Sequence, residues 1–435
     1  MAVAVLLVVS STSGHSIPLH MMDPPHFPEP MTYSQGVFYT TVYVGTPPQP
    51  MKVQVDTGSS DLVLYSDGCV GCTGRDPASM YNFGASSSGS YVDCYAACIH
   101  CQPFNSSTTT PLCDFLDAYG DGTEYRGIVT NEVAMLPSSS LSSSFSHPTK
   151  MQFGQILWDA NDTDPTTVQG LWGMAYGSLS SWSGTPVFQA MVEQNVVDAD
   201  IFSMCLPFPV VDSSPSAGMV FGSPALAALE GADVMYTPIA VESYYVVNVT
   251  TILVGGTKLE SQPEWFDDTI VDSGTTLTYL DSRIYNAFVA ILKASCSTSS
   301  PLPGICGPNP PLFNNQEVAL TPEQMAAFPS IQVAMPGFDQ GQYVVIPPHS
   351  YLLPFTSGTF YLGIFSSGAE GGTIFGDTTM GNYNVVFDRA NTRVGFAPVS
   401  TCVDHSTQAK ASAAAKASEA SGQSRAQRGF VSQQE

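Results

Sequence analysis

Two short motifs, one in each half of the chain, place an aspartate before a hydroxyl residue and a glycine. They read Asp56-Thr57-Gly58-Ser59-Ser60 and Asp272-Ser273-Gly274-Thr275-Thr276. A single triplet of this kind is usually a turn in which the Asp side chain binds its own backbone. Two copies could bring two carboxyl groups together, and such groups share a proton because they cannot both ionise easily. The pair would hold an acid and a base in one site, which is enough to activate water against an amide.

Each motif lies between two apolar runs of the kind that form β-strands, and each half later carries an apolar pair followed by glycine. We expect a diverged duplication in which the strand carrying each Asp turn is pinned by a second strand ending in that glycine. Two such turns related by a pseudo-twofold axis would place both carboxyls on rigid elements. The flanking runs are 53–55 and 62–65 in the first half and 269–271 and 277–280 in the second, and the glycine-ended pairs are 171–173 and 374–376.

The composition favours an acidic working environment and excludes nucleic acid as a partner. The 435 residues suffice for two or three domains. Only 11% are charged, and the net charge of −24 repels nucleic acid, which needs basic patches. Because Lys and Arg are few, many carboxylates could be protonated at low pH without losing an ionic partner. The plainer alternative is a soluble acidic protein with no special compartment.

The start of the sequence is typical of passage through the secretory pathway. Residues 1–14 are apolar and then small, which resembles a signal peptide, and no other run is long and apolar enough to span a membrane. Three glycosylation sequons agree with that route, at Asn105, Asn161 and Asn248. We therefore expect the protein to be secreted or to reside in an endolysosomal or vacuolar lumen.

Ten cysteines indicate disulfides rather than a metal site. Six of them crowd into one stretch, namely Cys69, Cys72, Cys94, Cys98, Cys101 and Cys113. Two Cys-x-x-Cys pairs have zinc-ribbon spacing, but the two extra cysteines and the secretory start favour three disulfides, with the pairing left open. A zinc-binding module is the alternative. The other candidates are Cys296 with Cys306, which would close a small loop, and Cys205 with Cys402, which would tie the middle of the chain to its end.

From residue 37 onward the sequence is typical of an all-β protein. Short runs rich in Val, Tyr, Thr and Phe alternate with Gly, Pro and Ser turns. Helical patterns are few, and the clearest are 186–192 and 282–293. Residues 15–36 form a short N-terminal or pro segment with extended character, 138–144 are typical of a surface loop, and the Ala/Ser/Gln-rich tail 403–435 is typical of disorder.

At this point the sequence resembles the pepsin-like aspartic proteases, family A1. Five segments carry the resemblance in family order, and they are 43–49, the Asp56 motif, 119–122, the Asp272 motif and 387–398. The cysteine-rich insert resembles the plant and protist branches. The resemblance implies a mainly β, bilobal acid-protease fold, in which two pseudo-twofold-related β-lobes, 37–210 and 211–402, flank a central cleft. It also implies a monomer that needs no cofactor or metal and binds an extended peptide or protein substrate.

The resemblance implies roles for ten residues. Asp56 and Asp272 would be the catalytic dyad. Positioning of the dyad would fall to the hydroxyls of Ser59 and Thr275 and to the backbone amides of Gly58 and Gly274. Substrate would be covered by a flap carrying Tyr119, Gly120 and Asp121. Asp377, at an apolar-Gly-Asp strand end, would be structural.

Two departures from the family bear on how the site is controlled. The family often has a tryptophan that bonds the flap tyrosine, and here Val63 stands at that position. The family's propeptide is usually longer and basic and blocks the dyad with a lysine, whereas residues 14–36 contain neither Lys nor Arg. Two functions are therefore open, an aspartic endopeptidase acting at acidic pH and an inactive relative that uses the cleft only for binding. Inactive relatives usually lack one of the two aspartates or a neighbouring hydroxyl, and this chain has all four of these residues, namely Asp56, Ser59, Asp272 and Thr275.

Overall fold

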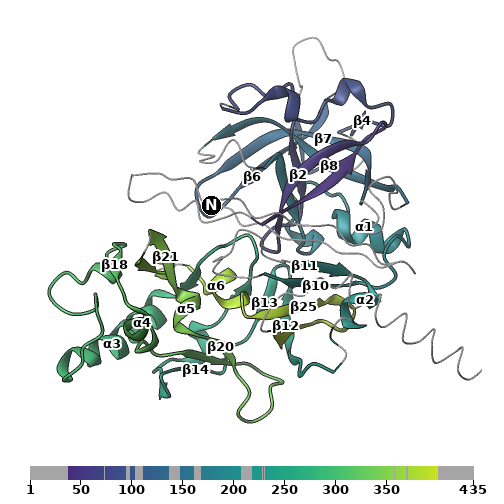
Figure 1. The fold of residues 1–435 in the computed structure, drawn as a ribbon. Coiled ribbons are helices and arrows are strands. Elements are labelled where there is room, and N and C mark those ends of the chain that lie inside the picture. Colours follow the sequence, from purple (N-terminus) through teal and green to yellow (C-terminus); the bar gives the residue numbers. More distant parts are fainter. Residues whose placement is uncertain are drawn as a thin grey trace, which may run out of the picture.

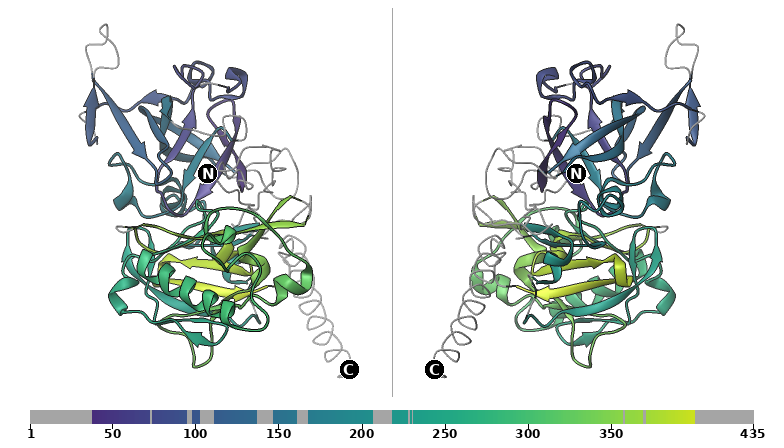
Figure 2. Two further views of the ribbon diagram at one scale, coloured as in Figure 1. Left: turned by 90° about the vertical axis from the view of Figure 1, so that its left-hand side faces the viewer. Right: turned by 90° about the vertical axis from the view of Figure 1, so that its right-hand side faces the viewer.

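The computed structural model describes residues 38–399 apart from 73, 95–97, 103–110, 137–146, 161–167, 207–217, 228, 230, 357 and 369–370. Several expectations fall outside these residues: the segments 1–14, 15–36, 138–144 and 403–435, the sequons at Asn105 and Asn161, and Cys402. The described chain is mainly β, which confirms the expected fold class. Figure 1 shows the first half, purple to blue, in the upper body and the second half, green to yellow, below it, and the views of Figure 2 agree.

The described part of the first half builds one nine-stranded sheet in the order β1-β2-β9-β3-β8-β7-β6-β5, with β4 beside β7. β1 pairs with both β2 and β7, so the sheet curls back on itself. Its strands are β1 (Tyr39–Val44), β2 (Gln49–Asp56), β3 (Leu62–Tyr65), β4 (Ser90–Tyr91), β5 (His100–Gln102), β6 (Leu112–Ala118), β7 (Glu124–Met135), β8 (Thr149–Ala160) and β9 (Gly170–Gly173).

The second large sheet has ten strands among the described residues, in the order β11-β10-β25-β26-β12-β13-β16-β24-β17-β23. β10 precedes residue 210 yet pairs with β25 near the end of the chain, so the two halves are interleaved there. The boundary at 210 stays a prediction. The strands are β10 (Ile201–Cys205), β11 (Gly218–Phe221), β12 (Met235–Glu242), β13 (Tyr245–Val247), β16 (Ile270–Val271), β17 (Thr278–Leu280), β23 (Ile364–Ser366), β24 (Ile374–Phe375), β25 (Tyr383–Asp388) and β26 (Arg393–Pro398).

The two sheets contain the same four-strand arrangement. In the first half, β2 runs parallel to β9, β9 antiparallel to β3, and β3 parallel to β8. In the second half, β16, β24, β17 and β23 repeat that order and those directions. The glycine-ended strands β9 and β24 thus pin the strands that carry the Asp turns, as the sequence predicts. The repeat of pairing directions is the structural counterpart of the repeated motif.

Two smaller sheets and short helices complete the second half. Helix α3 follows strand β17. It begins after Asp281, which caps it by accepting a hydrogen bond from the Arg283 amide, and Ile284, Phe288 and Leu292 form its buried face. Both expected helices are present as α1 and α3. The bounds are β14 (Thr251–Val254), β15 (Thr257–Lys258), β19 (Ile331–Ala334), β20 (Val344–Ile346), β18 (Val318–Ala319), β21 (Leu352–Thr356) and β22 (Thr359–Leu362), with α1 (Val187–Glu193), α2 (Ser223–Ala227), α3 (Ser282–Ala294), α4 (Pro322–Ala326), α5 (Pro348–Tyr351) and α6 (Asp377–Met380).

A continuous apolar core joins the halves. Trp172 of β9 lies 5.9 Å from Phe221 of β11, measured between ring centroids, and Phe188 of α1 stacks on Phe221 at 5.4 Å. All three side chains are fully buried. This aromatic packing fixes the end of β9, and therefore the first Asp turn, against the second sheet. Within the described residues, no helix combines the length and apolar character that a membrane crossing requires.

Candidate active site

Asp56 is the last residue of β2 and is 5% exposed. The strand is half-exposed at its start and buried on both faces from Val53 onward, so the carboxyl emerges from inside the protein. The Gly58 amide donates to Asp56 Oδ1 over 2.7 Å, and the Ser59 hydroxyl donates to Oδ2 over 2.5 Å. The turn therefore fixes both oxygens of this carboxyl from residues of its own motif.

Asp272 directly follows β16, where its amide donates to the Phe375 carbonyl of β24 over 3.1 Å, and it is 7% exposed. The Gly274 amide donates to Oδ1 over 2.8 Å and the Thr275 hydroxyl to Oδ2 over 2.6 Å. The second motif thus repeats the bonding of the first, atom for atom. This repetition places the two glycines and the two hydroxyl residues where the resemblance expects them.

The two carboxyls face each other across the junction of the motifs. A Cβ at Gly58 would meet the Asp272 carboxyl, 2.6 Å from Oδ1, and a Cβ at Gly274 would collide with Oδ1 of Asp56. Each glycine thus supplies the space that the opposite carboxyl occupies, and a side chain at either position would displace that carboxyl. The structure brings together from the two halves the acid pair that the sequence predicts.

A set of crossed hydrogen bonds locks the two turns together. Thr57 Oγ1 donates to the Val271 carbonyl over 3.0 Å, and Ser273 Oγ donates to the Val55 carbonyl over 3.0 Å. The two amides donate across as well, Thr57 N to Ser273 Oγ over 3.2 Å and Ser273 N to Thr57 Oγ1 over 2.9 Å. All four groups are buried, so the carboxyls sit on a rigid base. Sequence reasoning assigned no role to these middle residues, although their hydroxyls recur in both motifs.

Burial and neighbouring acids raise the pKa of two carboxyl groups at the site. Burial, followed by the negative charge of Asp272, holds the pKa of Asp56 well above its usual range. Asp377, at the start of α6, is fully buried close by, and its pKa is also raised well above the usual range, first by burial and then by Asp272. Neither oxygen of Asp377 has a hydrogen-bond partner among the described residues. Asp377 therefore adds a third acidic group to the site. The sequence analysis assigned this residue only a structural role.

The predicted flap is the hairpin between β6 and β7. Tyr119 follows β6, and its amide donates to the Thr123 carbonyl over 2.9 Å to close the turn. Asp121 Oδ1 accepts from the Thr123 amide over 2.8 Å, and Gly122 adopts a left-handed φ of 90°. A Cβ at Gly120 would meet nothing within 4 Å, so its backbone is open to approach. The hairpin thus presents its main chain at the tip.

Contacts between aromatic rings support the predicted flap, whereas the family often uses a tryptophan at the position of Val63. Tyr119 packs edge-to-face on Tyr125 of β7 at 5.4 Å, and Tyr125 packs edge-to-face on Tyr65 of β3 at 5.7 Å. The Tyr65 hydroxyl donates to Asp159 over 2.9 Å, while Val63 is completely buried. We call Tyr119, Tyr125 and Tyr65 the tyrosine ladder. Sequence reasoning missed Tyr125 and Tyr65, because nothing in the sequence indicates that strands β7 and β3 lie next to the tip of the flap.

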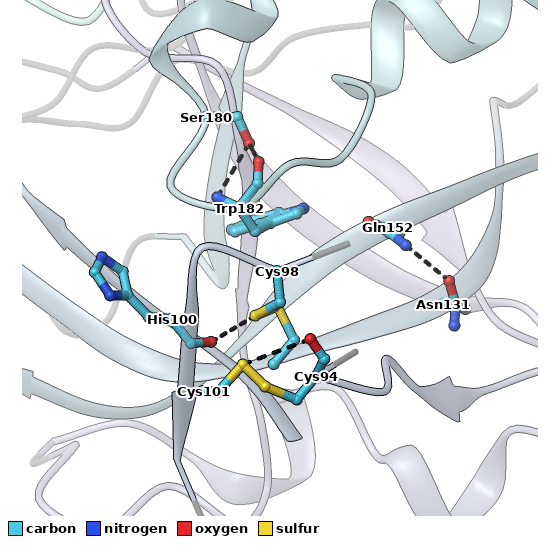
Figure 3. The surroundings of a disulfide bond; sticks show 9 residues. Cys94, Cys98, His100, Cys101, Asn131, Gln152, Ser180 and Trp182 are labelled. Atoms are coloured by element: carbon cyan, nitrogen blue, oxygen red, sulfur yellow. Dashed lines mark hydrogen bonds between the residues drawn. A yellow bond between two sulfur atoms is a disulfide. The ribbon is translucent and has the colours of Figure 1, made fainter. Parts of the chain in front are cut away.

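The cysteine-rich insert is closed by disulfides. Of its six cysteines, Cys69 pairs with Cys72, Cys94 with Cys101, and Cys98 with Cys113, in agreement with three disulfides. Figure 3 shows the Cys94–Cys101 bridge beside Cys98, close to Trp182. In the second half, Cys296 pairs with Cys306, as expected from their spacing.

Two further sequence candidates are seen only in part. Cys205 is disulfide-bonded, and its expected partner lies outside the described residues, among which no cysteine is free. Asn248 is exposed between β13 and β14, where a glycan could be carried.

Comparison with known proteins agrees with this geometry. The family model described as "Eukaryotic aspartyl protease" matches residues 37–399. The chain is 26% identical to pepsin A of Gallus gallus over 86% of its length and 87% of the relative's. It is 28% identical to cathepsin E of Aquarana catesbeiana, covering 85% of this chain and 81% of that one. It is 27% identical to the aspartic proteinase nepenthesin-1 of Nepenthes gracilis, covering 87% and 81%. With the pepsin-like fold and these matches in hand, the chain belongs to the eukaryotic aspartyl protease family and is an aspartic-type endopeptidase.

Proposed function

We propose that the protein hydrolyses peptide bonds at acidic pH by activating water between Asp56 and Asp272. The observation that carries the proposal is the facing pair of carboxyls, each bound by a glycine amide and a hydroxyl of its own motif. The raised pKa of Asp56 beside Asp272 supports a pair that keeps one proton between them.

The reaction needs one ionised and one protonated carboxyl. The carboxylate takes a proton from a water molecule as that water attacks the scissile carbonyl carbon, and the carboxylic acid donates its proton to the carbonyl oxygen. As the tetrahedral adduct collapses, the amine nitrogen takes the proton from the carboxyl that had accepted it from water, and a hydroxyl of the adduct returns a proton to the other carboxylate, so the pair is restored to its starting state. No covalent intermediate and no cofactor is required. The crossed bonds of Thr57 and Ser273 keep both carboxyls in position throughout.

The substrate is an extended peptide or protein segment beneath the flap. The backbone around Gly120 and Asp121 offers main-chain groups, so a peptide binds as an added strand with apolar pockets reading its side chains. Because both carboxyls come from one chain, a monomer is sufficient for catalysis. The disulfides and the exposed sequon at Asn248 support passage through the secretory pathway to an extracellular or lysosome-like lumen.

The test is cleavage of a denatured protein across about pH 2 to 7, the range in which carboxyls titrate. Wild type and Asp272→Asn are compared, each with and without pepstatin. Cleavage at acidic pH that both the inhibitor and the substitution abolish supports the proposal. Absence of cleavage by correctly disulfide-bonded wild type, even after its N-terminal segment is trimmed, favours the alternative of a binding protein on a protease fold.

A further inference from the structure

A second pair of acidic side chains lies at the base of the flap, apart from the dyad. Asp61 stands between β2 and β3 in the loop that begins with the Asp56 motif, and it is 5% exposed. Asp117 is near the end of β6, the strand that leads into Tyr119, and it is half-buried. One of its oxygens, Oδ2, is buried without a hydrogen-bond partner.

A short loop after β9 binds both carboxyls. The Ser180 hydroxyl donates to Asp61 Oδ1 over 2.7 Å, and the Ser181 amide donates to Asp61 Oδ2 over 2.7 Å. The Ser181 hydroxyl donates to Asp117 Oδ1. Ser181 therefore bridges the catalytic loop and the flap strand, through its backbone on one side and its side chain on the other.

The next residue fastens the same loop to the flap strand. Trp182 is buried and packs edge-to-face on Phe115 of β6, with ring centroids 5.4 Å apart. Figure 3 shows Ser180 bonded to the backbone of Trp182, beside the disulfides of the insert. Any movement of β6 away from this loop would break both the polar bridge and the ring contact.

In the part of the chain that the structure describes, no basic side chain balances the two acids. Among the described residues no Lys or Arg forms an ion pair with Asp61 or Asp117, and Arg126, across the hairpin, pairs with Glu124 instead. The phenol of Tyr119 lies within electrostatic reach of Asp117, Asp61 and Asp56, Tyr125 of β7 stands opposite Asp117 in the strand pairing, and the hydroxyls of the serine loop bind the two acids.

Both pKa values lie above the ordinary carboxyl range. Burial, followed by the charge of Asp117, raises the pKa of Asp61 to about 7, and burial raises that of Asp117 to about 6. Groups shifted in this direction stabilise the folded arrangement at low pH, and their contribution is lost as the pH rises through the shifted values. Above that range two negative charges would share a poorly solvated site, which opposes the contact between β6 and the serine loop.

We propose that Asp61, Asp117 and Ser181 form a proton-dependent clasp that positions the flap, closed while at least one of the two carboxyls carries a proton. The clasp rests on the proposed function, and it adds a second cause, besides loss of the dyad's proton, for the fall of activity toward neutral pH. Its members act through Tyr119 rather than on the substrate, so they are positioning residues. In acidic surroundings the flap strand stays bound to the catalytic loop, and near neutrality both acids ionise and the strand is released.

The substitution Asp117→Asn tests the clasp, because asparagine keeps an oxygen for the Ser181 hydroxyl and cannot ionise. We expect the activity at pH 7, relative to that at pH 4, to rise about tenfold, which corresponds to a shift of roughly one unit in the descending limb of kcat/KM. The ascending limb at low pH should not move. Glu124→Gln is the matched control, since it removes an acid from the same hairpin outside the clasp. Ser181→Ala should instead raise KM at acidic pH, because it removes the bridge while leaving both acids.

A second readout needs no catalysis. Hydrogen exchange of residues 112–125 is followed from about pH 4 to 7.5 in an Asp272→Asn background, with rates corrected for the intrinsic dependence on pH. We expect protection of the hairpin to fall near neutrality and to persist there when Asp117→Asn is added. The clasp is overturned if Asp117→Asn and Glu124→Gln show the same hydrogen-exchange protection of the hairpin and the same descending limb of kcat/KM. The expected exchange, together with no cleavage by the wild-type protein at any pH, overturns the proposed function and leaves the clasp in place.

Discussion

Thr57 and Ser273 exchange hydrogen bonds across the pseudo-twofold axis, each hydroxyl accepting from the other residue's amide over 3.2 Å and 2.9 Å. Each hydroxyl also donates to a carbonyl of the opposite strand. The turns that carry Asp56 and Asp272 are therefore bound directly to each other. This relationship makes the geometry of the dyad depend on two residues that have no part in proton transfer.

Replacing Thr57 by valine removes a hydroxyl and leaves the Ser273 amide and the Val271 carbonyl buried without partners. Each unmet group costs about 1–3 kcal/mol, so we expect unfolding free energy to fall by roughly 2–5 kcal/mol, with a large loss of kcat. Denaturant unfolding and steady-state kinetics measure the two effects. Thr57→Ser keeps the hydroxyl and serves as the control. A valine variant as stable as the serine variant would contradict the role of the crossed bonds.

Gly274→Ala should lower activity by about a hundredfold or more, because its methyl group would collide with Asp56 Oδ1 and displace it. Displacing a catalytic group by about 1 Å can cost roughly a hundredfold in rate, and overpacking costs about 1–3 kcal/mol of stability. The comparison is kcat together with the unfolding midpoint for Gly274→Ala and Gly68→Ala. A Cβ at Gly68 would make only an ordinary contact at 3.7 Å, so that variant should behave as wild type. Equal activity of the two variants would mean that the carboxyls do not face the glycines as described.

Stability should decline as the pH rises from about 4 to 8. Burial and a neighbouring acid raise the pKa of Asp56, and burial raises those of Asp61 and Asp117. Raised carboxyl pKa values mean that the folded state binds more protons than the unfolded chain, so stability is greatest at low pH and is lost as these groups ionise. Asp272→Asn removes the repulsion on Asp56, and we expect its melting temperature to exceed that of wild type at pH 7 and to match it near pH 3. Parallel curves at all pH values would contradict the shared proton.

The Cys98–Cys113 disulfide should matter to catalysis more than the Cys296–Cys306 disulfide. Both close short loops, of 15 and 10 residues in separation, and removing either should cost roughly 3 kcal/mol. Only the first lies on β6, which leads to the flap. Replacing both cysteines of each pair by alanine should therefore raise KM severalfold in the first case and leave it near wild type in the second. Melting temperature and KM are measured for both double variants, and equal KM values would separate the insert from the flap.

Much of the architecture could be predicted because it depends on repetition along the chain. Two Asp motifs with apolar flanks and glycine-ended pairs led to paired strands, and β2 with β9 and β16 with β24 have that arrangement. The helical pattern at 282–293 likewise predicted α3. Each of these signals lies within a short stretch of sequence, and the repetition of the strand signals in the two halves indicated which strands pair.

The support of the flap could not be predicted, since it depends on contacts between distant segments. Tyr65, Tyr125 and Tyr119 come from three separate strands or turns, and nothing in their spacing indicates that their rings meet. Likewise, Asp61 and Asp117 are joined only through a loop that follows β9. The pairing of the insert's cysteines was open for the same reason. Such contacts follow from the closed pairing of the first sheet rather than from local sequence.

The crossed bonds between the two turns also determine how late in synthesis and folding the dyad can be assembled. Synthesis proceeds from the N-terminus, so Asp56, its turn and the whole flap are complete while Asp272 has yet to be translated. At that stage the first half contains only one of the two dyad carboxyls. Residues 271–273, which bind Thr57 and fill the space beside Gly58, have not yet been made. On the proposed mechanism, a nascent or truncated chain that lacks the second turn is therefore unable to hydrolyse peptide bonds. We expect activity to arise only when the second sheet has folded against the first.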